Sequence, residues 1–358
     1  MKLLERSTLT GAVNGTTTST LNILLATINR DFLSNNWTGF GGTLVLNNTD
    51  STVRGIQLSV ATGFINAGMV NTTLDVQEAS VTAVTNSGGN TLQVGALTGS
   101  SAGILGGNSN VAGGVTWQVG AKNLNTTFAG TIVNGLSATS LTKVGSSGTL
   151  TLSGANTYTG ATTIAANGGI LSLDSAGSTT ARLAGATAIT VNSGGTLLLT
   201  NSVLATASND RINDAATVIL AGGTLNMGGF SEGLTGVAGV GALTLTANSF
   251  LDFGTTGSSN LIQFSGVGTH TANTVLTISN FEDSATDHLY FTGNASDFTG
   301  VFIQADVVFN GIAGYSALQQ TGFYEITAVP EPSTWVGAGV ITGLAGWSQR
   351  RRLQNLVA

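Results

Sequence analysis

One short phrase recurs along this chain: a glycine, a small or polar residue, and two apolar residues on either side of a third position. Side chains alternate along a strand, so both apolar residues of the phrase point to the same face. A strand this short cannot bury that face alone, but copies stacked in parallel about 4.8 Å apart bury it against one another. The copies lie at 42–46, 130–133, 148–152, 169–173, 195–199, 223–227 and 241–245.

The spacing of these copies predicts a solenoid. From Gly130 onward their glycines are 18 to 28 residues apart, which indicates coils of about 20 residues separated by Gly and Asn turns. Glycine suits the corners, where the chain bends with a positive φ. The predicted fold is all-β, a right-handed parallel β-helix, and an antiparallel sandwich is the alternative. We place the coils at 39–260, after an N-terminal cap or remnant of a longer chain at 1–38.

Two regions depart from the phrase. Leu21, Leu24, Leu25 and Ile28 have helical spacing, which predicts a cap helix over residues 19–32. Between 261 and 328 phenylalanine becomes frequent and the glycine phrase fades. We expect a C-terminal β cap there, with longer strands that close the end of the solenoid, because an uncapped last coil exposes a sheet edge.

Composition narrows the class of protein further. Charged residues make up 8% of the 358 residues, against about 25% in an ordinary domain, and 51 residues are glycine. The hydrophobic share of 41% is too high for a disordered chain. The net charge is −6 and there is no cysteine, so the sequence argues against nucleic-acid binding and excludes disulfides and thiolate zinc sites. This is the composition of a secreted β protein.

One segment closely resembles a known family. Residues 141–173 read LTKVGSSGTLTLSGANTYTGATTIAANGGILSL. They resemble the autotransporter-associated β-strand repeat of surface passengers at positions 141, 143, 148, 150, 152, 154, 156, 158, 160, 163 and 164. After Ile164 the turn is slightly longer than in the family pattern. The resemblance implies a β-solenoid and carries no chemistry.

A second resemblance concerns the tail at 329–358. Val329, Pro330, Glu331 and Pro332 precede an apolar segment from Trp335 to Trp347, and the cluster Arg350, Arg351 and Arg352 follows it. This order resembles a PEP-CTERM sorting signal. The resemblance implies export, retention in the membrane and processing by an exosortase-type sorting protease near the triplet.

Physical chemistry supports a short membrane-spanning helix in this tail only in part. Thirteen helical residues span about 20 Å and a bilayer core needs about 30 Å, so the flanks from Pro332 to Gln349 must be recruited. The arginines place the C-terminus in the cytoplasm and the acidic body outside. The alternative is an apolar helix docked on the body. Because Glu5, Arg6 and Ser7 interrupt any leader, we expect a signal peptide upstream of Met1, or another route of export.

The titratable residues offer few catalytic or metal-binding arrangements. His288 lies near Glu282, Asp283 and Asp287, which is either a cation site or an acidic turn before a strand. His270 is expected in a turn.

Asp210, Arg211 and Asp214 are the close carboxylate–arginine group within 122–252. This group is either a lyase-like centre or local charge balance in a loop. We interpret both clusters as structural and assign no catalytic, cofactor-binding or metal-binding residue.

These observations predict an exported structural or adhesin-like solenoid at the cell surface or in the extracellular matrix. It is expected to be held transiently by its tail, with extracellular polysaccharide as a candidate partner. The alternatives are a β-helix carbohydrate-active enzyme, either a polysaccharide lyase or a hydrolase, and a glycan-binding module.

Overall fold

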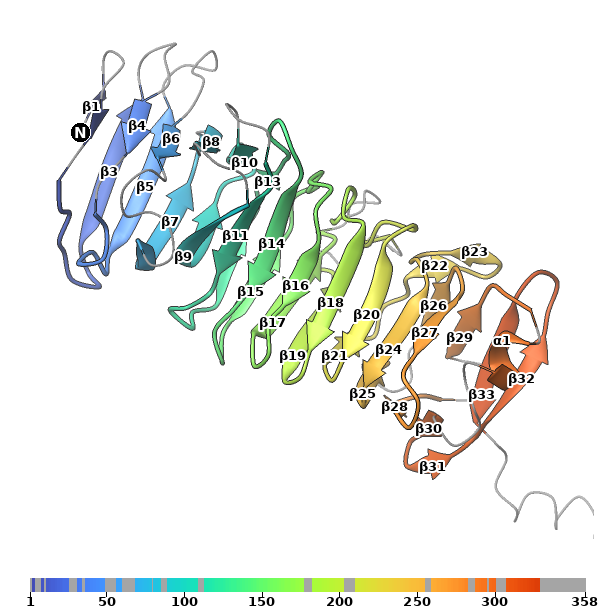
Figure 1. Cartoon of the computed structure of the whole chain (residues 1–358). Coiled ribbons are helices and arrows are strands. Elements are labelled where there is room, and N and C mark those ends of the chain that lie inside the picture. The colour runs from blue at the N-terminus through green and yellow to red at the C-terminus, as the bar shows by residue number, and fades with distance from the viewer. Residues whose placement is uncertain are drawn as a thin grey trace, which may run out of the picture.

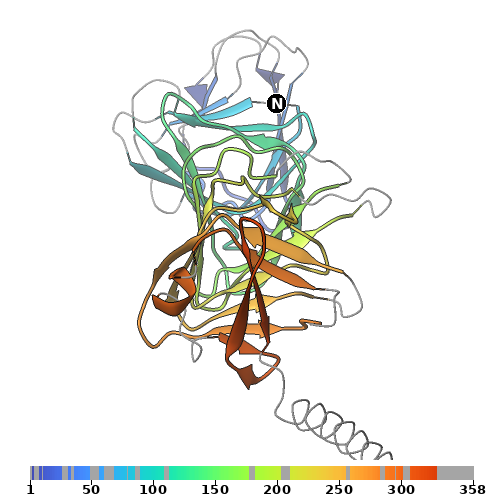
Figure 2. The ribbon, with the colours of Figure 1, turned by 90° about the vertical axis from the view of Figure 1, so that its right-hand side faces the viewer.

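The chain forms an elongated stack of parallel coils (Figure 1). In Figure 2 the coils lie one behind another when seen from the C-terminal end. This computed structural model describes residues 2–3, 8–9, 11–25, 31–33, 36–48, 56–59, 68–78, 80–84, 89–108, 113–176, 182–202, 210–254, 259–282, 287–294, 296–300 and 307–328. In the middle of the stack each coil contributes to three faces, which we call the first, second and third in chain order.

The second face runs from one end of the described stack to the other. Each strand pairs in parallel with the strand of the next coil. The strands are β1 (Lys2–Leu3), β3 (Thr20–Leu25), β5 (Thr43–Asn48), β7 (Met69–Val76), β9 (Asn90–Gly99), β12 (Thr126–Phe128), β15 (Thr149–Leu152), β17 (Gly169–Asp174), β19 (Gly195–Thr200), β21 (Thr224–Asn226), β25 (Ser249–Asp252), β28 (Leu276–Ser279) and β30 (Val307–Phe309).

The first face begins with the N-terminal parts of β7 and β9. It continues through β11 (Val115–Val119), β14 (Thr139–Lys143), β16 (Thr162–Ile164), β18 (Ala188–Asn192), β20 (Thr217–Ala221), β24 (Leu243–Ala247) and β27 (Val267–His270). The third face starts with β2 (Thr8–Leu9), β4 (Asp31–Leu33), β6 (Ile56–Ser59), β8 (Ser80–Val84), β10 (Ile104–Asn108) and β13 (Thr131–Ile132).

Beyond β13 the third face shrinks to single bridges. Asn156 pairs with Leu183 and Leu183 with Ile212, each in parallel. Further along, Glu232 bridges to Ile262 in β26 (Leu261–Phe264), which pairs in parallel with β29 (His288–Phe291). Each of these coils therefore still has three faces, although its third face is paired through a single residue.

Buried aliphatic side chains stack along the inside of each face. On the second face Leu150, Leu171, Leu197 and Leu225 are register partners and all are buried, as are Leu251 and Ile278 beyond them. Each side chain covers the one in the next coil, which removes apolar surface from water at about 25 cal/mol per Å². The parallel coils predicted from the phrase are confirmed, and the antiparallel sandwich is wrong.

The predicted coil length was too short. Register partners on the second face are separated by 21, 26 and 28 residues between Leu150 and Leu225. The phrases at 148, 169, 195 and 223 begin strands of this face, but the phrase at Gly130 leads into β13 of the third face. The phrase at Gly241 leads into β24 of the first face. The prediction counted every phrase as one coil, although the phrases lie on three different faces, and it therefore underestimated the number of residues in a coil.

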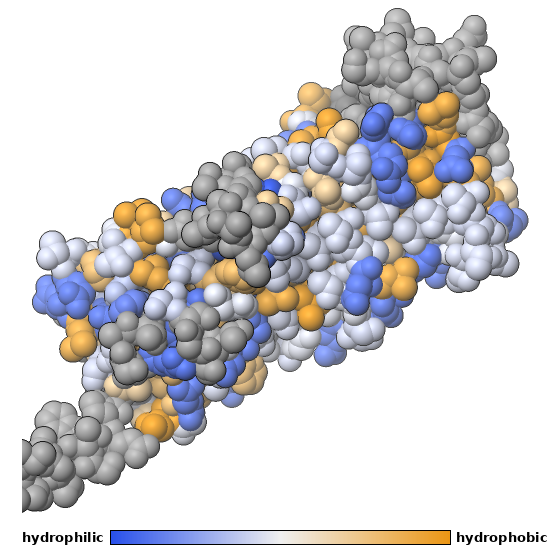
Figure 3. Space-filling view, turned by 180° about the vertical axis from the view of Figure 1, so that it is seen from behind, coloured by the Kyte–Doolittle hydropathy of each residue, from blue (hydrophilic) through white to orange (hydrophobic). Residues whose placement is uncertain are grey.

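Polar side chains form rows on the outside of the stack, as the alternation predicts. Thr142, Thr163 and Thr190 are register partners on the first face. Gln93 donates from its side-chain amide to the Gln118 side chain of the next coil at 2.8 Å. The surface in Figure 3 is accordingly pale over much of its described area, the colour of residues with intermediate hydropathy. Uncharged rows avoid the repulsion that stacked identical charges would bring.

The helix predicted over residues 19–32 is wrong. Residues 20–25 form β3 and residues 31–33 form β4, and β3 pairs in parallel with both β1 and β5. Ile23 is fully buried in this strand, with the Asn22 side chain exposed beside it. Non-local pairing on two sides outweighs the local helical spacing of the leucines.

Short antiparallel strands end the stack. The parallel pairing continues past residue 260 to β30, which then pairs antiparallel with β31 (Ile312–Ala313). On the third face β29 pairs antiparallel with β33 (Tyr324–Ala328), and β33 with β32 (Tyr315–Gln319). The strands of this cap are no longer than those of the coils, so the predicted longer strands are wrong. Reversal of strand direction, rather than strand length, closes the end.

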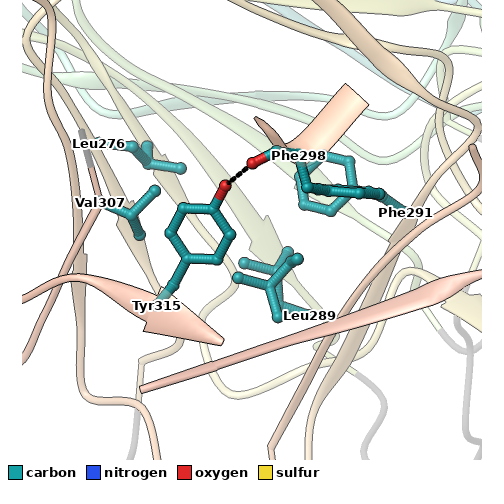
Figure 4. A pocket seen from close by; sticks show the side chains of 7 residues that line it. Leu276, Leu289, Phe291, Phe298, Val307 and Tyr315 are labelled. Atoms are coloured by element: carbon teal, nitrogen blue, oxygen red, sulfur yellow. Dashed lines mark hydrogen bonds between the residues drawn. The ribbon is translucent and has the colours of Figure 1, made fainter. Parts of the chain in front are cut away.

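Aromatic and aliphatic packing fills the inside of this cap (Figure 4). The Tyr315 hydroxyl donates to the Phe298 carbonyl of the four-residue helix α1 (Asp297–Gly300). Phe291 stacks on Phe264 of the preceding coil, with ring centroids 5.0 Å apart. The gap left between Leu276, Tyr315 and their neighbours is about 10 Å³, close to the smallest space that holds one water molecule. A separate hairpin, β22 (Gly233–Leu234) with β23 (Val237–Ala238), lies beside β26.

Candidate functional site

The residues of the repeat at 141–173 hold the coils together. Lys143 is buried, and its ammonium donates to the carbonyls of Val144 at 2.9 Å and Gly168 at 2.8 Å. Gly168 lies one coil further on, so the side chain joins two corners of the stack. Burial lowers the pKa of Lys143 to about 8. The role of Lys143 is therefore hydrogen bonding to turn carbonyls.

Asn156 has a comparable role on the third face. Its side-chain carbonyl accepts the N–H of Ile132 in the preceding coil at 2.8 Å, and its amide donates to the Arg182 carbonyl in the next coil at 2.8 Å. The amide also donates to the Gly154 carbonyl at 2.9 Å. One side chain thus replaces the backbone groups of a missing strand. Buried amide and carbonyl groups need such partners, because leaving one unpaired costs about 1–3 kcal/mol.

Tyr158 completes the set of buried polar residues in the repeat. The side chain is fully buried, and its hydroxyl lies 2.5 Å from the Thr162 hydroxyl. Burial raises the pKa of this phenol above its ordinary value. A neutral, enclosed hydroxyl with one hydroxyl partner suits packing of the corner and offers no group to an external ligand.

The group formed by Asp210, Arg211 and Asp214 is divided by the fold. Arg211 is fully buried, Asp210 is partly buried and Asp214 is exposed. The Arg211 guanidinium donates to the carbonyls of Thr200 at 2.9 Å and Ser231 at 3.1 Å, and it lies over the Phe230 ring. Burial lowers the pKa of Arg211 and raises that of Asp210. A guanidinium enclosed in this way has no route to a saccharide lying on the surface.

The main charged partner of Arg211 is Glu232, which the sequence analysis did not single out. One Glu232 oxygen accepts the N–H groups of Arg211 and Ile212, both at 2.8 Å, and the other lies 3.7 Å from the Arg211 guanidinium. Burial raises the pKa of Glu232 to about 8, which outweighs the opposite effects of these N–H groups and of Arg211. Glu232 therefore accepts backbone N–H groups of the preceding coil, as Asn156 accepts the N–H of Ile132.

The residues around His288 also have structural partners. Asp287 accepts the N–H groups of Asn260 at 3.0 Å and Glu282 at 2.9 Å. His288 Nδ1 lies 2.6 Å from a Glu325 oxygen on β33, and its ring stacks on Tyr290. Asp283 lies outside the described residues. Among the residues that are described, no group of three His, Asp or Glu side chains is placed to hold a metal ion.

His270 lies at the end of β27 beside a turn. Its Nε2 is 2.8 Å from the Thr274 hydroxyl, which also donates to the Thr271 carbonyl. This small network fixes the turn between β27 and β28.

The residues that resemble a sorting signal lie outside the described part of the chain. This holds for Val329, Pro330, Glu331 and Pro332, for the segment between Trp335 and Trp347, and for Arg350, Arg351 and Arg352. Within the described residues, no helix is both long and apolar enough to cross a bilayer.

A hollow lies at the corner that leads into the second face. Its volume is about 680 Å³, within the range of ligand-binding pockets. Two stacked loops at 15–17 and 38–41 line one side, Asn71 of β7 lies in it, and Lys122 and Leu124 line the other side. Burial lowers the pKa of Lys122. Sequence reasoning missed this site because its residues are scattered over more than a hundred positions.

Comparison with known families identifies the same repeat that the sequence resembles at 141–173. A family model described as the passenger-associated transport repeat matches residues 141–173. No curated protein is similar enough to this chain to match it. The matched segment begins within β14 and ends within β17, and it contains the buried Lys143, Asn156 and Tyr158 described above. The chain therefore contains a passenger-type repeat within a parallel β-solenoid, which fits an exported structural or adhesin-like protein.

Proposed function

We propose that this protein is an exported, non-enzymatic structural or adhesin-like solenoid of the cell surface or extracellular matrix. The observation that carries the proposal is the passenger-associated repeat at 141–173, built into a stack whose coils continue on both sides of it. Such repeats form long, rigid supports in which each coil contacts only its neighbours. The coils turn right-handed in this proposal, as parallel crossover connections generally do.

The tail supplies the proposed mode of retention. Pro330 and Pro332 disfavour helix before them, which keeps the chain extended and accessible to an exosortase. The apolar segment after them forms a temporary membrane-spanning helix, and Arg350–Arg352 hold its end in the cytoplasm. The described solenoid ends at Ala328 with β33 paired on both sides. In this proposal the tail adds nothing to the stability of the body.

Cell fractionation tests the proposal. The chain is expressed behind a secretory signal peptide in a host that has an exosortase, and compared with a chain ending at Ala328. The full chain should be found in the membrane fraction and then as a shortened surface form. The truncated chain should be released with an unchanged melting temperature.

A second variant separates sorting from folding. Replacing Arg350, Arg351 and Arg352 by serine should reduce retention in the membrane, because the cytoplasmic charges are gone. Three arginines of the body, Arg30, Arg54 and Arg182, do not provide a matched control, because Arg182 is buried and its replacement would disturb the stack. The matched control is the same triple change to lysine, which keeps the charge and should keep retention. A truncated body that unfolds or aggregates would contradict the sorting role and indicate a docked helix.

A further inference from the structure

The hollow exists because two coils lack a corner loop. β7 and β9 each continue as one strand from the first face to the second, with only a shift of register between Met69 and Thr73 at the corner. In the coils on either side, loops at 38–42 and 120–125 occupy this corner. The loops therefore form walls on both sides of a gap two coils wide. Its shape comes from the backbone path of four coils, so it is part of the rigid stack.

Lys122 crosses the floor of this gap. Its ammonium donates to the Gly41 carbonyl at 2.8 Å and to the Thr73 hydroxyl at 3.0 Å, on coils that precede its own. The stem passes over Gly95, where an added Cβ would lie 2.6 Å from the Lys122 Cγ. The absence of a side chain at Gly95 is what allows the lysine to reach across β9.

The electrostatics of the hollow favour an anion. An ammonium has three N–H donors, and the two contacts to Gly41 and Thr73 use two of them. Among the described residues that line the hollow there is no Asp or Glu. No carboxylate of the described wall therefore neutralises the positive charge, in a protein whose net charge is −6.

The remaining wall chemistry matches a sugar ring. Thr17, Thr38 and Asn71 are exposed and carry hydroxyl or amide groups that pair with sugar hydroxyls. Leu124 is 46% exposed at the edge of the hollow and offers an apolar surface to the C–H face of a pyranose. A volume of about 680 Å³ is large enough for more than one ring.

We propose that this hollow binds an acidic saccharide, with the carboxylate of a hexuronic acid residue on the Lys122 ammonium. The proposal rests on the adhesin-like role above and adds to it a ligand class and a site. Thr17, Thr38 and Asn71 position the sugar hydroxyls. The stacked loops exclude water from one side of the ring, and no bond of the saccharide is broken.

Calorimetric titration of the full chain with a galacturonic acid trimer tests this proposal, with the fully methyl-esterified trimer as the neutral control. The acidic trimer should bind, and the ester should bind at least about tenfold more weakly, which is the loss of one charge-assisted hydrogen bond. Lys122→Met keeps the stem over Gly95 and removes the charge, so it should weaken binding of the acidic trimer to the level of the ester.

A second variant guards against loss of folding in Lys122→Met. Asn71→Asp keeps the shape of an exposed side chain and adds a negative charge to the hollow, so it should also weaken binding of the acidic trimer. Asn167→Asp makes the same change on an exposed corner outside the hollow and should leave binding unchanged. Equal binding of trimer and ester, no binding of the trimer, or equal effects of Asn71→Asp and Asn167→Asp would overturn the proposal. Fractionation results do not enter this test, so the two proposals can fail separately.

Discussion

At Asn156 the third face has a single residue of backbone pairing, and a side-chain amide supplies the other partners. Glu232 supplies them three coils later with one carboxylate oxygen. Both side chains are fully buried, and both serve N–H groups of the coil before their own. Polar residues that would suggest chemistry in the sequence are thus hydrogen-bonding substitutes for a shortened strand.

Asn156→Ala should lower the free energy of unfolding by about 1–3 kcal/mol, because the buried N–H of Ile132 loses its partner, whereas the Arg182 carbonyl keeps the backbone N–H of residue 156. Urea unfolding measures the difference as a shift in midpoint at constant slope. Thr163→Ala, on the outward row of the first face, is the control and should change stability by less than about 0.5 kcal/mol. Equal shifts for the two variants would refute the bridging role of Asn156.

Glu232 should make stability depend on pH. Its pKa in the folded chain, about 8, lies above its ordinary value of 4.5, so between these values the folded chain holds a proton that the unfolded chain has released. The free energy of unfolding should therefore fall as pH rises through this window. The pKa of Lys143 is lowered to about 8, so above that pH this residue makes the free energy of unfolding rise with pH. The measurement therefore stays below pH 8.

Glu232→Gln provides the comparison. It retains an oxygen for the N–H groups of Arg211 and Ile212 and cannot ionise. Urea unfolding at about pH 5 and about pH 7.5 should show a smaller loss of stability in the variant than in the wild-type chain. The same pH dependence in both chains would show that Glu232 does not titrate in this window.

At the scale of the strand, β19 offers a matched pair of leucines. Leu197 is fully buried between Leu171 and Leu225, whereas Leu198 on the same strand points outward and is half-buried. Leu197→Ala should cost about 2–5 kcal/mol through lost burial and the cavity left between two coils. Leu198→Ala should cost well under half as much. Similar losses in thermal unfolding would mean that the inward and outward faces are assigned wrongly.

Strands with the Gly-Thr-Leu-x-Leu phrase could be predicted because a period of two is a local signal, and β15, β17, β19 and β21 follow it. The helix at 19–32 failed because Ile23 is buried by strands that lie outside that window. The third face has too few strand residues in its middle to give a period. Lys122 and Gly41 are 81 positions apart, so no local pattern brings the hollow together.

At the scale of the whole molecule, the stack places inward apolar rows, outward polar rows and corner hydrogen bonds in register over successive coils. The side-chain bridges and the hollow both depend on this register, because it decides which residues meet in neighbouring coils. The chain has no cysteine, so a single engineered pair reports on one register contact without interference.

Disulfide formation between neighbouring coils tests the stack most directly. Thr163 and Thr190 are register partners on the outward row of the first face, about 4.8 Å apart by the spacing of parallel strands. The double variant Thr163→Cys, Thr190→Cys should form an intramolecular disulfide under mild oxidation. Thr142→Cys with Thr190→Cys spans two coils, beyond the roughly 7 Å limit, and should stay reduced. A disulfide in the second variant and none in the first would contradict the parallel stack.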